Sequence, residues 1–187
     1  TLEQDNKYIY TMGFIESKSK YIIYKIDKKI GKVVMIIDED MSYLFVNNYY
    51  IVTLDNAWEH IYFFNKKNGK IIKTIKGEKI IFVNDKYLIY RLGHSIICLN
   101  GKTLNKIWYS EYLDRITLYK GKLYGYFSEK RFIVMDVKTG KIIWEDNNNV
   151  NIDFASGTTP VVNDEYVVTI TEFPNGETKS YIWVYKK

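Results

Sequence analysis

The sequence has few of the residues that disulfide-stapled and helical proteins need. Cysteine occurs once in 187 residues, which excludes an internal disulfide framework and a cluster of cysteine metal ligands. Alanine occurs only at Ala57 and Ala155, whereas isoleucine, tyrosine, valine and phenylalanine are abundant. Because these residues favour strands over helices, we expect an all-β protein. The one cysteine, Cys98, lies in the apolar run SIICL and is expected to be a small, buried core residue.

Long apolar runs are also absent. No stretch of 18 apolar residues occurs, so the sequence predicts no membrane-spanning helix. The length fits one domain, and a hydrophobic fraction of 47% with 17% aromatic residues is enough for a packed core. The chain begins with Thr1 rather than methionine, which leaves open whether a signal peptide or a larger region precedes it.

The formal net charge of +5 has two interpretations. A basic surface attracts nucleic acid or anionic headgroups by long-range electrostatics. The alternative is a composition rich in lysine, asparagine and isoleucine, typical of AT-rich coding sequence, in which lysines only solvate the surface. We favour the second interpretation and do not expect nucleic acid to be a partner.

A nine-residue motif repeats at nearly constant spacing. The sharpest copy is DVKTGKIIW, from Asp136 to Trp144, and earlier copies begin at Asp27, Asn65 and Asn100. The steps between these first residues are 38, 35 and 36 residues. A period of this size indicates a propeller or a solenoid.

A second signature, a short polar turn followed by an aromatic-rich strand, divides the chain into five units. It begins at Asp5, Asn47, Asn84, Lys120 and Asn163. The predicted units are roughly residues 1–37, 41–75, 79–109, 114–145 and 159–187. The pairs Asn84 with Asp85 and Lys120 with Gly121 are predicted to form two-residue hairpin turns at positive φ.

Each unit contains four short apolar segments and no helical periodicity. This pattern predicts a β-propeller of four-stranded antiparallel blades, about five in number, as one domain. The glycine at the fifth motif position, Gly31, Gly69 and Gly140, suits a left-handed turn, and Leu104 in the third copy is expected to shift the positive φ by one residue. The ninth position, which is Trp108 and Trp144 in the last two copies, is expected to pack against the adjacent blade.

The motif DVKTGKIIW, together with TTPVVNDEYVV at residues 158–168, resembles the repeat of quinoprotein-like β-propellers, the PQQ-like repeat. The resemblance implies radial blades locked by the motif tryptophan. Enzymatic members of that family bind pyrroloquinoline quinone beside calcium, with a pair of adjacent cysteines. Because this chain has one cysteine, we expect no cofactor, no catalytic residues and a non-enzymatic member.

The fifth unit ends at SYIWVYKK, where the motif's first residue should stand, so its outermost strand is missing. Propellers leave no long exposed edge, because a free edge pairs with other chains. Three explanations are open: the chain is a piece of a larger propeller, another chain supplies the edge, or a five-bladed ring contains one short blade.

The candidate interaction loops lie at the end opposite the lysine-rich turns. Trp58 and His60 belong to the loop DNAWEH, and His94 holds a comparable position one unit later. The two histidines show no metal-ligand spacing, so no metal site is expected. Asn148 and Phe154 in the asparagine-rich stretch 146–159, and Asn175 in the hairpin 172–180, complete the candidate set, because irregular loops on rigid scaffolds carry recognition.

The expected function is a non-catalytic scaffold that binds a protein or a polysaccharide through this loop end. The alternative is a fragment of a larger quinoprotein-like enzyme or sensor. A weaker alternative is an anionic ligand or nucleic acid bound at the lysine-rich end. The family resemblance favours an extracytoplasmic or cell-surface location, with a cytoplasmic one still open.

Overall fold

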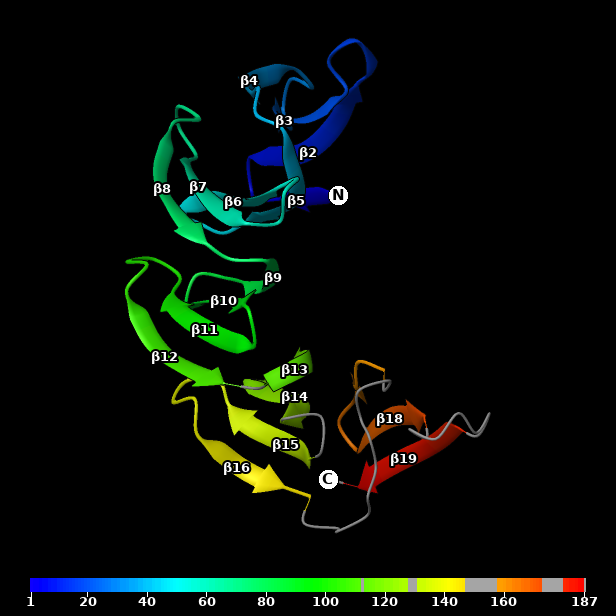
Figure 1. The fold of residues 1–187 in the computed structure, drawn as a ribbon. Coiled ribbons are helices and arrows are strands. Elements are labelled where there is room, and N and C mark those ends of the chain that lie inside the picture. The colour runs from blue at the N-terminus through cyan, green and yellow to red at the C-terminus, as the bar shows by residue number, and fades with distance from the viewer. Residues whose placement is uncertain (112, 128–130, 147–157, 173–179, 187) are drawn as a thin grey trace. The chain divides into compact units, whose positions relative to one another are not determined.

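The computed structural model describes residues 1–111, 113–127, 131–146, 158–172 and 180–186 (Figure 1). These residues form five antiparallel sheets, and within them the only helical element is the single 3-10 turn η1 (Glu16–Lys18). The all-β prediction is confirmed. Each sheet contains consecutive strands of the chain in sequence order, as expected for propeller blades.

The sheets follow one another along the chain. The first contains β1 (Leu2–Gln4), β2 (Tyr8–Ile15), β3 (Lys20–Asp27) and β4 (Val33–Ile37). The second contains β5 (Met41–Val46), β6 (Tyr50–Asp55), β7 (His60–Asn65) and β8 (Ile71–Lys76). The third contains β9 (Lys79–Val83), β10 (Tyr87–Leu92), β11 (Ser95–Asn100) and β12 (Lys106–Glu111).

The last two sheets differ in their number of strands. The fourth contains β13 (Leu113–Tyr119), β14 (Lys122–Phe127), β15 (Arg131–Asp136) and β16 (Ile142–Glu145). The fifth contains β17 (Val161–Val162), β18 (Tyr166–Glu172) and β19 (Ser180–Lys186), so its described part has three strands.

The chain divides into two compact units. The first unit comprises residues 1–93 and 97–106, and the second comprises residues 94–96 and 107–187. The first unit holds two core clusters: one contains Tyr10, Leu44 and Phe64, and the other contains Leu54 and Phe63. Each fully buried side chain of this size stabilises the fold by roughly 1.5–3 kcal/mol.

The second unit has its own core around Tyr126, Phe132 and Val167. Both units share a pattern in which the middle strands of a sheet are apolar on both faces, as in β6, because each face of a stacked sheet is covered. Cys98 is fully buried, as expected, and burial raises the pKa of its thiol to about 12. This places Cys98 in the core as an unreactive residue.

The first turn of most blades is stabilised by a side chain rather than by positive φ. Asn84 Oδ1 accepts hydrogen bonds from the backbone N–H groups of Lys86 (2.9 Å) and Tyr87 (2.7 Å), and Asn84 and Asp85 do not adopt positive φ. The predicted positive-φ hairpin is therefore wrong for this pair. The prediction is correct for Lys120 and Gly121, which have φ of 45° and 76°. A lysine side chain cannot accept the two backbone N–H groups that Asn84 accepts, so this turn uses positive φ instead.

The third-to-fourth turn combines a capping side chain with a left-handed residue at its fifth position. Gly31, Gly69 and Gly140 have φ of 65°, 68° and 69°. Leu104 itself has φ of 57°, so the expected shift of the positive φ to the next residue is wrong. The left-handed conformation costs a non-glycine residue about 1–2 kcal/mol. Burial of the Leu104 side chain, which is 5% exposed, offsets that cost.

The ninth motif position contacts the fifth-position turn residue of the following sheet. In the first unit, Lys73 Nζ donates to the Leu104 carbonyl oxygen at 3.3 Å. In the second unit, the Trp108 indole lies on Gly140, where a Cβ atom would be 2.6 Å from Trp108 Cγ. Trp108 Nε1 also donates to the Val137 carbonyl oxygen at 2.8 Å. The turn of one sheet thus holds the outer strand of the sheet before it.

Two glycine substitutions distinguish the need for a positive φ in this turn from the need for space beside the Trp108 ring. Gly31→Ala meets nothing within 4 Å, so only its φ of 65° opposes alanine, and we expect a loss of about 1–2 kcal/mol. Gly140→Ala has the same φ cost and also clashes with the Trp108 ring, which adds about 1–3 kcal/mol. Urea unfolding followed by circular dichroism measures both losses. Equal losses would show that the Trp108 contact does not constrain Gly140.

Candidate functional site

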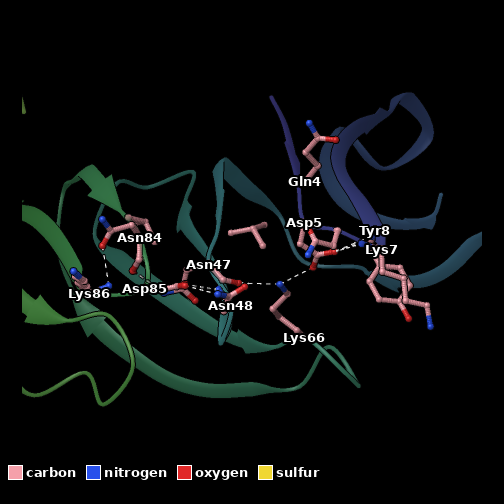
Figure 2. A pocket seen from close by; sticks show the side chains of 13 residues that line it. Gln4, Asp5, Lys7, Tyr8, Asn47, Asn48, Lys66, Asn84, Asp85 and Lys86 are labelled. Carbon is pink, nitrogen blue, oxygen red and sulfur yellow. Dashed lines mark hydrogen bonds and ion pairs between the residues drawn. The ribbon is translucent and has the colours of Figure 1, made fainter. Parts of the chain in front are cut away.

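A polar cavity of about 720 Å³ lies within the first unit (Figure 2). We call it the turn cavity. It is lined by the first turns of three sheets, residues 4–8, 46–48 and 83–86, and by Lys66 from the β7–β8 turn. Because each of these turns joins the first and second strands of its sheet, the repeat brings equivalent polar residues to one place.

Asp5 is the centre of the hydrogen-bond network on one side of the turn cavity. Its Oδ1 accepts from the backbone N–H groups of Lys7 (2.9 Å) and Tyr8 (2.8 Å), as at the other capped turns. Its Oδ2 accepts from the Tyr10 hydroxyl (2.9 Å) and pairs with Lys66 Nζ (2.7 Å). The Asp5 carboxylate thus has an N–H, O–H or ammonium partner at both oxygens.

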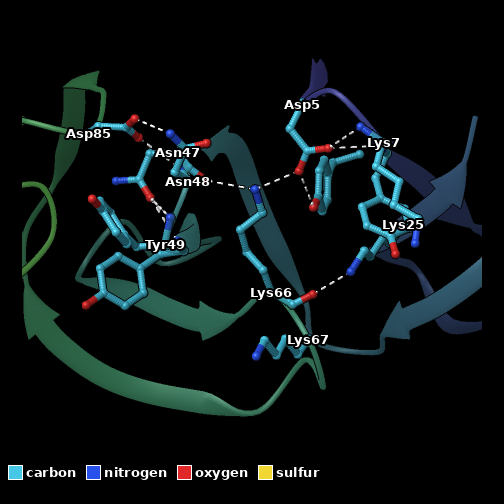
Figure 3. Close-up of polar contacts among 12 residues, drawn as sticks. Asp5, Lys7, Lys25, Asn47, Asn48, Tyr49, Lys66, Lys67 and Asp85 are labelled. Atoms are coloured by element: carbon cyan, nitrogen blue, oxygen red, sulfur yellow. Dashed lines mark hydrogen bonds and ion pairs between the residues drawn. The ribbon is translucent and has the colours of Figure 1, made fainter.

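Lys66 bridges two of the three turns (Figure 3). Besides the Asp5 carboxylate, its ammonium donates to the Asn47 carbonyl oxygen at 2.8 Å, and its side chain is 14% exposed. Lys25 Nζ in turn donates to the Lys66 carbonyl oxygen at 2.6 Å and lies 3.9 Å from the centre of the Tyr8 ring. Two lysines of this end of the molecule are therefore held by internal partners.

Asparagine side chains join the second and third turns. Asn47 Oδ1 caps its own turn, while Asn47 Nδ2 donates to the carbonyl oxygens of Asn84 (3.1 Å) and Gly101 (3.0 Å). Asp85 accepts from the backbone N–H of Asn48 at 2.8 Å and from the Asn48 side-chain amide. The walls of the turn cavity are thus fixed by hydrogen bonds before any ligand binds.

The charge state of Asp5 follows from these contacts. Burial alone raises the pKa of the carboxyl, but the bonds from Lys66, the two backbone N–H groups and the Tyr10 hydroxyl outweigh burial. They hold the pKa of Asp5 well below its usual range, so Asp5 is ionised at all physiological pH values. Burial and the bond to Asp5 raise the pKa of Tyr10, which stays a neutral donor.

Several groups at the turn cavity remain available to a ligand. Among the described residues, the Lys86 ammonium and the Gln4 and Asn6 amides make no side-chain hydrogen bond or ion pair. These are neutral donors and acceptors together with one cation, and a second lining ammonium, that of Lys7, lies 5.1 Å from the centre of the Tyr8 ring. Such groups suit a ligand rich in hydrogen-bonding groups rather than a strongly charged one.

Of the sequence-predicted residues, Trp58 lies in the turn that follows β6 and His60 is the first residue of β7, whereas the turn cavity lies where β6 begins. Trp58 is 49% exposed, has φ of 61° and packs edge-on against Tyr43 with ring centres 5.5 Å apart. His60 Nδ1 lies 3.1 Å from Asp55 Oδ2, and the Asp55 carboxylate also caps this turn. Neither residue lines the turn cavity.

The remaining candidate residues are distributed as follows. His94 is exposed in the turn between β10 and β11. Asn148, Phe154 and Asn175 lie outside the described residues. Within the described part of the chain, no group of three or more histidine, cysteine, aspartate or glutamate side chains is arranged to hold a metal ion.

Over the ranges that the structure describes, no helix has the length and apolar character needed to cross a bilayer.

The sequence did not single out the turn cavity, although it contained the signal. The first residues of the repeated turns, Asp5, Asn47 and Asn84, mark the units of the repeat in the sequence and also form walls of the cavity. Equivalent turns of consecutive blades lie at one end of a propeller. Polar residues that recur there could therefore have been predicted to meet.

Asp5→Asn tests the network by its pH dependence. The variant keeps the Oδ1 cap and loses the charge, so we expect a loss of about 1–3 kcal/mol at pH 7. Because the folded-state pKa is lowered, the wild-type advantage exists above the unfolded pKa of about 4 and is lost as pH falls below it. Urea unfolding at pH 7 and pH 3 should therefore show a smaller difference at pH 3.

Asp38→Asn is the matched control for this measurement. Asp38 is paired with Lys18 and Lys20 at the surface, where solvent screens the charges, so its replacement should change stability little. A difference between wild type and Asp5→Asn that stays the same at both pH values would contradict the proposed network.

Comparisons with known proteins agree on the fold. No family model matches the chain, and no curated protein matches its sequence. Among solved structures, BamB from Moraxella catarrhalis is 10% identical, with a TM-score of 0.52 over 100% of this chain and 73% of that one. The computationally designed protein Ika8 is also 10% identical, with a TM-score of 0.60 over 98% of this chain and 57% of that one. The sheets and these similarities together show a β-propeller fold.

Proposed function

We propose that this chain is a non-catalytic β-propeller interaction module that binds a protein partner in the turn cavity. The observation that carries the proposal is the convergence of three capped turns on one preformed polar cavity. A preformed wall binds without an ordering cost, which is the property that a recognition site needs. The similarity to BamB supports the propeller fold on which the module is built.

A protein segment fits the cavity better than a polysaccharide. Sugar rings bind by stacking on an open aromatic face, and Tyr8 is the aromatic residue of the cavity lining. Lys25 Nζ lies 3.9 Å and Lys7 Nζ 5.1 Å from the centre of the Tyr8 ring. With cations over this ring, the groups left for recognition are amides and Lys86, which match the N–H and C=O groups of a peptide.

An anionic ligand is also disfavoured at this end of the first unit. Lys66 pairs with Asp5, Lys25 donates to a carbonyl oxygen, and Lys28 Nζ donates to the Asp5 carbonyl oxygen at 2.7 Å. A nucleic acid needs several free cations to replace the counterions of its phosphates. The Asp5 carboxylate neutralises Lys66, and the bonds of Lys25 and Lys28 fix their ammonium groups in the fold, so these three lysines are less able to move onto phosphates.

The loop-end residues expected from the sequence remain a proposed second contact surface. The Tyr43 and Trp58 rings are both exposed and in contact, which is how aromatic anchors of interfaces lie. The resemblance to the PQQ-like repeat supports a place among non-enzymatic quinoprotein-like propellers and an extracytoplasmic location for the module.

Selection from a displayed random peptide library on the immobilised protein tests the proposal. We expect enriched peptides to bind with dissociation constants on the order of 1–100 μM. Lys86→Glu changes an available cation of the cavity and should weaken these peptides by about tenfold or more. Lys67→Glu is the matched control (Figure 3). It makes the same charge change in a neighbouring turn, at a residue that does not line the cavity.

Two outcomes would contradict the proposal. One is equal weakening by the Lys86 and Lys67 substitutions, which would reflect net charge rather than the cavity. The other is selective binding on a polysaccharide array with no enriched peptide. Bound quinone absorbance or calcium-dependent dehydrogenase activity in the purified protein would instead favour the enzyme or sensor alternative.

A further inference from the structure

Two aromatic rings of the second sheet are exposed and contact each other. Tyr43 in β5 is 45% exposed, and Trp58 in the turn between β6 and β7 is 49% exposed. Their rings lie at 86° to each other, with centres 5.5 Å apart. The second sheet packs against the first and the third sheets through the two core clusters of the first unit. The pair is therefore exposed on a four-stranded sheet that has both of its neighbours in place.

Both aromatic residues have a backbone conformation that large side chains rarely adopt. Tyr43 has φ of 56° and Trp58 has φ of 61°. The left-handed residues of the corresponding turns in the first and third sheets are the smaller Ser19 and Gly93. The left-handed conformation costs a non-glycine residue free energy, and burial offsets this cost less at half-exposed rings than at Leu104. Backbone strain that packing does not offset is found chiefly at functional sites.

Hydrogen bonds hold the backbone that carries the two rings. Tyr43 is the extra residue of a bulge where β5 pairs with β6. Beside it, Ser42 Oγ donates to the Asp55 carbonyl oxygen at 3.0 Å. Asp55 Oδ1 accepts from the backbone N–H of Glu59 at 2.8 Å and closes the turn that contains Trp58. The rings are thus positioned before a partner arrives, which lowers the entropy cost of binding.

The segments that carry the pair are acidic, although the whole chain has a formal net charge of +5. Residues 38–43 and 55–60 contain no lysine or arginine and five carboxylates, namely Asp38, Glu39, Asp40, Asp55 and Glu59. Three of these, at positions 38, 40 and 55, bond to other residues of the chain. Among the described residues, Glu39 and Glu59 make no side-chain hydrogen bond or ion pair. An unpaired carboxylate thus directly follows the exposed Trp58 in the chain.

Lysines near these segments do not cancel the negative charge. Lys18 and Lys20 both pair with Asp38, at 2.8 Å and 3.0 Å. Lys76 lies opposite His60 in the register of β7 and β8 and adds one positive charge. Five carboxylates and these three lysines leave a net charge of −2 beside the aromatic pair.

We propose that the Tyr43–Trp58 pair binds an arginine-bearing segment of a protein partner, which rests on the proposed function, where the loop end is a second contact surface. A guanidinium stacks on the face of an indole or a phenol and donates in a planar fork to a carboxylate. Exposed rings beside the unpaired carboxylates of Glu39 and Glu59 match this side chain. An acidic segment would be repelled by the same charges.

A labelled peptide with arginine at every second position, separated by glycine, is the probe. We expect saturable binding to the protein by fluorescence anisotropy. The lysine version should bind about threefold or more weakly, because an ammonium lacks the planar fork. The indole N–H signal of Trp58, assigned by its loss in Trp58→Phe, should shift in an NMR titration with the arginine peptide, while the signals of the other tryptophans should not.

Variants of the protein provide the matched controls. Trp58→Leu keeps an apolar side chain without the indole, and Glu59→Gln removes one charge with little change of shape. Each should weaken the arginine peptide about fivefold or more and change the urea midpoint little, because both residues are exposed. Trp144→Leu and Glu165→Gln make the same changes at exposed residues of the second unit and should leave the affinity unchanged.

Four results would overturn the proposal: no saturable binding, equal affinity for the arginine and lysine peptides, an unmoved Trp58 signal, or undiminished binding by Trp58→Leu. Glycan binding that is lost in Trp58→Leu, without arginine-peptide binding, would also overturn it, since the rings would then serve a polysaccharide. Lys86→Glu separates this site from the turn cavity, because it should weaken the library peptides and leave the arginine peptide unchanged. Failure at one site can therefore be told from failure at the other.

Discussion

The tight turns of each sheet depend on a short side chain that accepts backbone N–H groups. A hairpin turn leaves N–H donors that neither strand satisfies, and leaving them unpaired is costly. Asp5, Asn47 and Asn84 accept such donors at the first turns, and Asp27, Asn65, Asn100 and Asp136 do so at the outer turns. Lysine replaces this side chain at Lys120, and there the turn uses positive φ at Lys120 and Gly121 instead.

Capped turns also connect neighbouring sheets within each unit. The side-chain Oδ1 of Asn47 accepts a hydrogen bond within its own turn, and the side-chain Nδ2 donates to the next sheet. One side chain therefore stabilises both a turn and the contact between two sheets. The outer turn of one sheet supports the ninth motif residue of the sheet before it, as Gly140 supports Trp108. Sheet stacking in this fold is thus determined by the turns as well as by the apolar clusters.

The two units contain cavities of different chemistry. The turn cavity of the first unit is polar, and two of its charged residues, Asp5 and Lys66, form an internal ion pair. The second unit has a cavity lined mostly by apolar side chains, including Phe132, Trp144 and Val184. Both cavities lie where residues of neighbouring sheets meet.

Most of the fold could be predicted from the sequence. The spacing of the motif and the alternation of apolar segments indicated strands in groups of four, and composition excluded helices. Local chemistry explains the errors. The turn at Asn84 and Asp85 needs no positive φ because a side chain caps it, and Leu104 accepts positive φ because its side chain is buried in the core.

The candidate site was decided by tertiary structure. Sequence reasoning selected exposed aromatic and loop residues such as Trp58, because composition identifies unusual residues but not which turns meet. Residues 5, 47 and 84 are far apart in the chain, and only the stacking of sheets brings them to one cavity. The exposure of the two motif tryptophans likewise depends on tertiary contacts. Trp108 is buried because the turn at Gly140 covers it, and Trp144 is 44% exposed. The sequence by itself therefore determined the strands and their order, and packing between strands distant in sequence decided which residues meet to line the cavities.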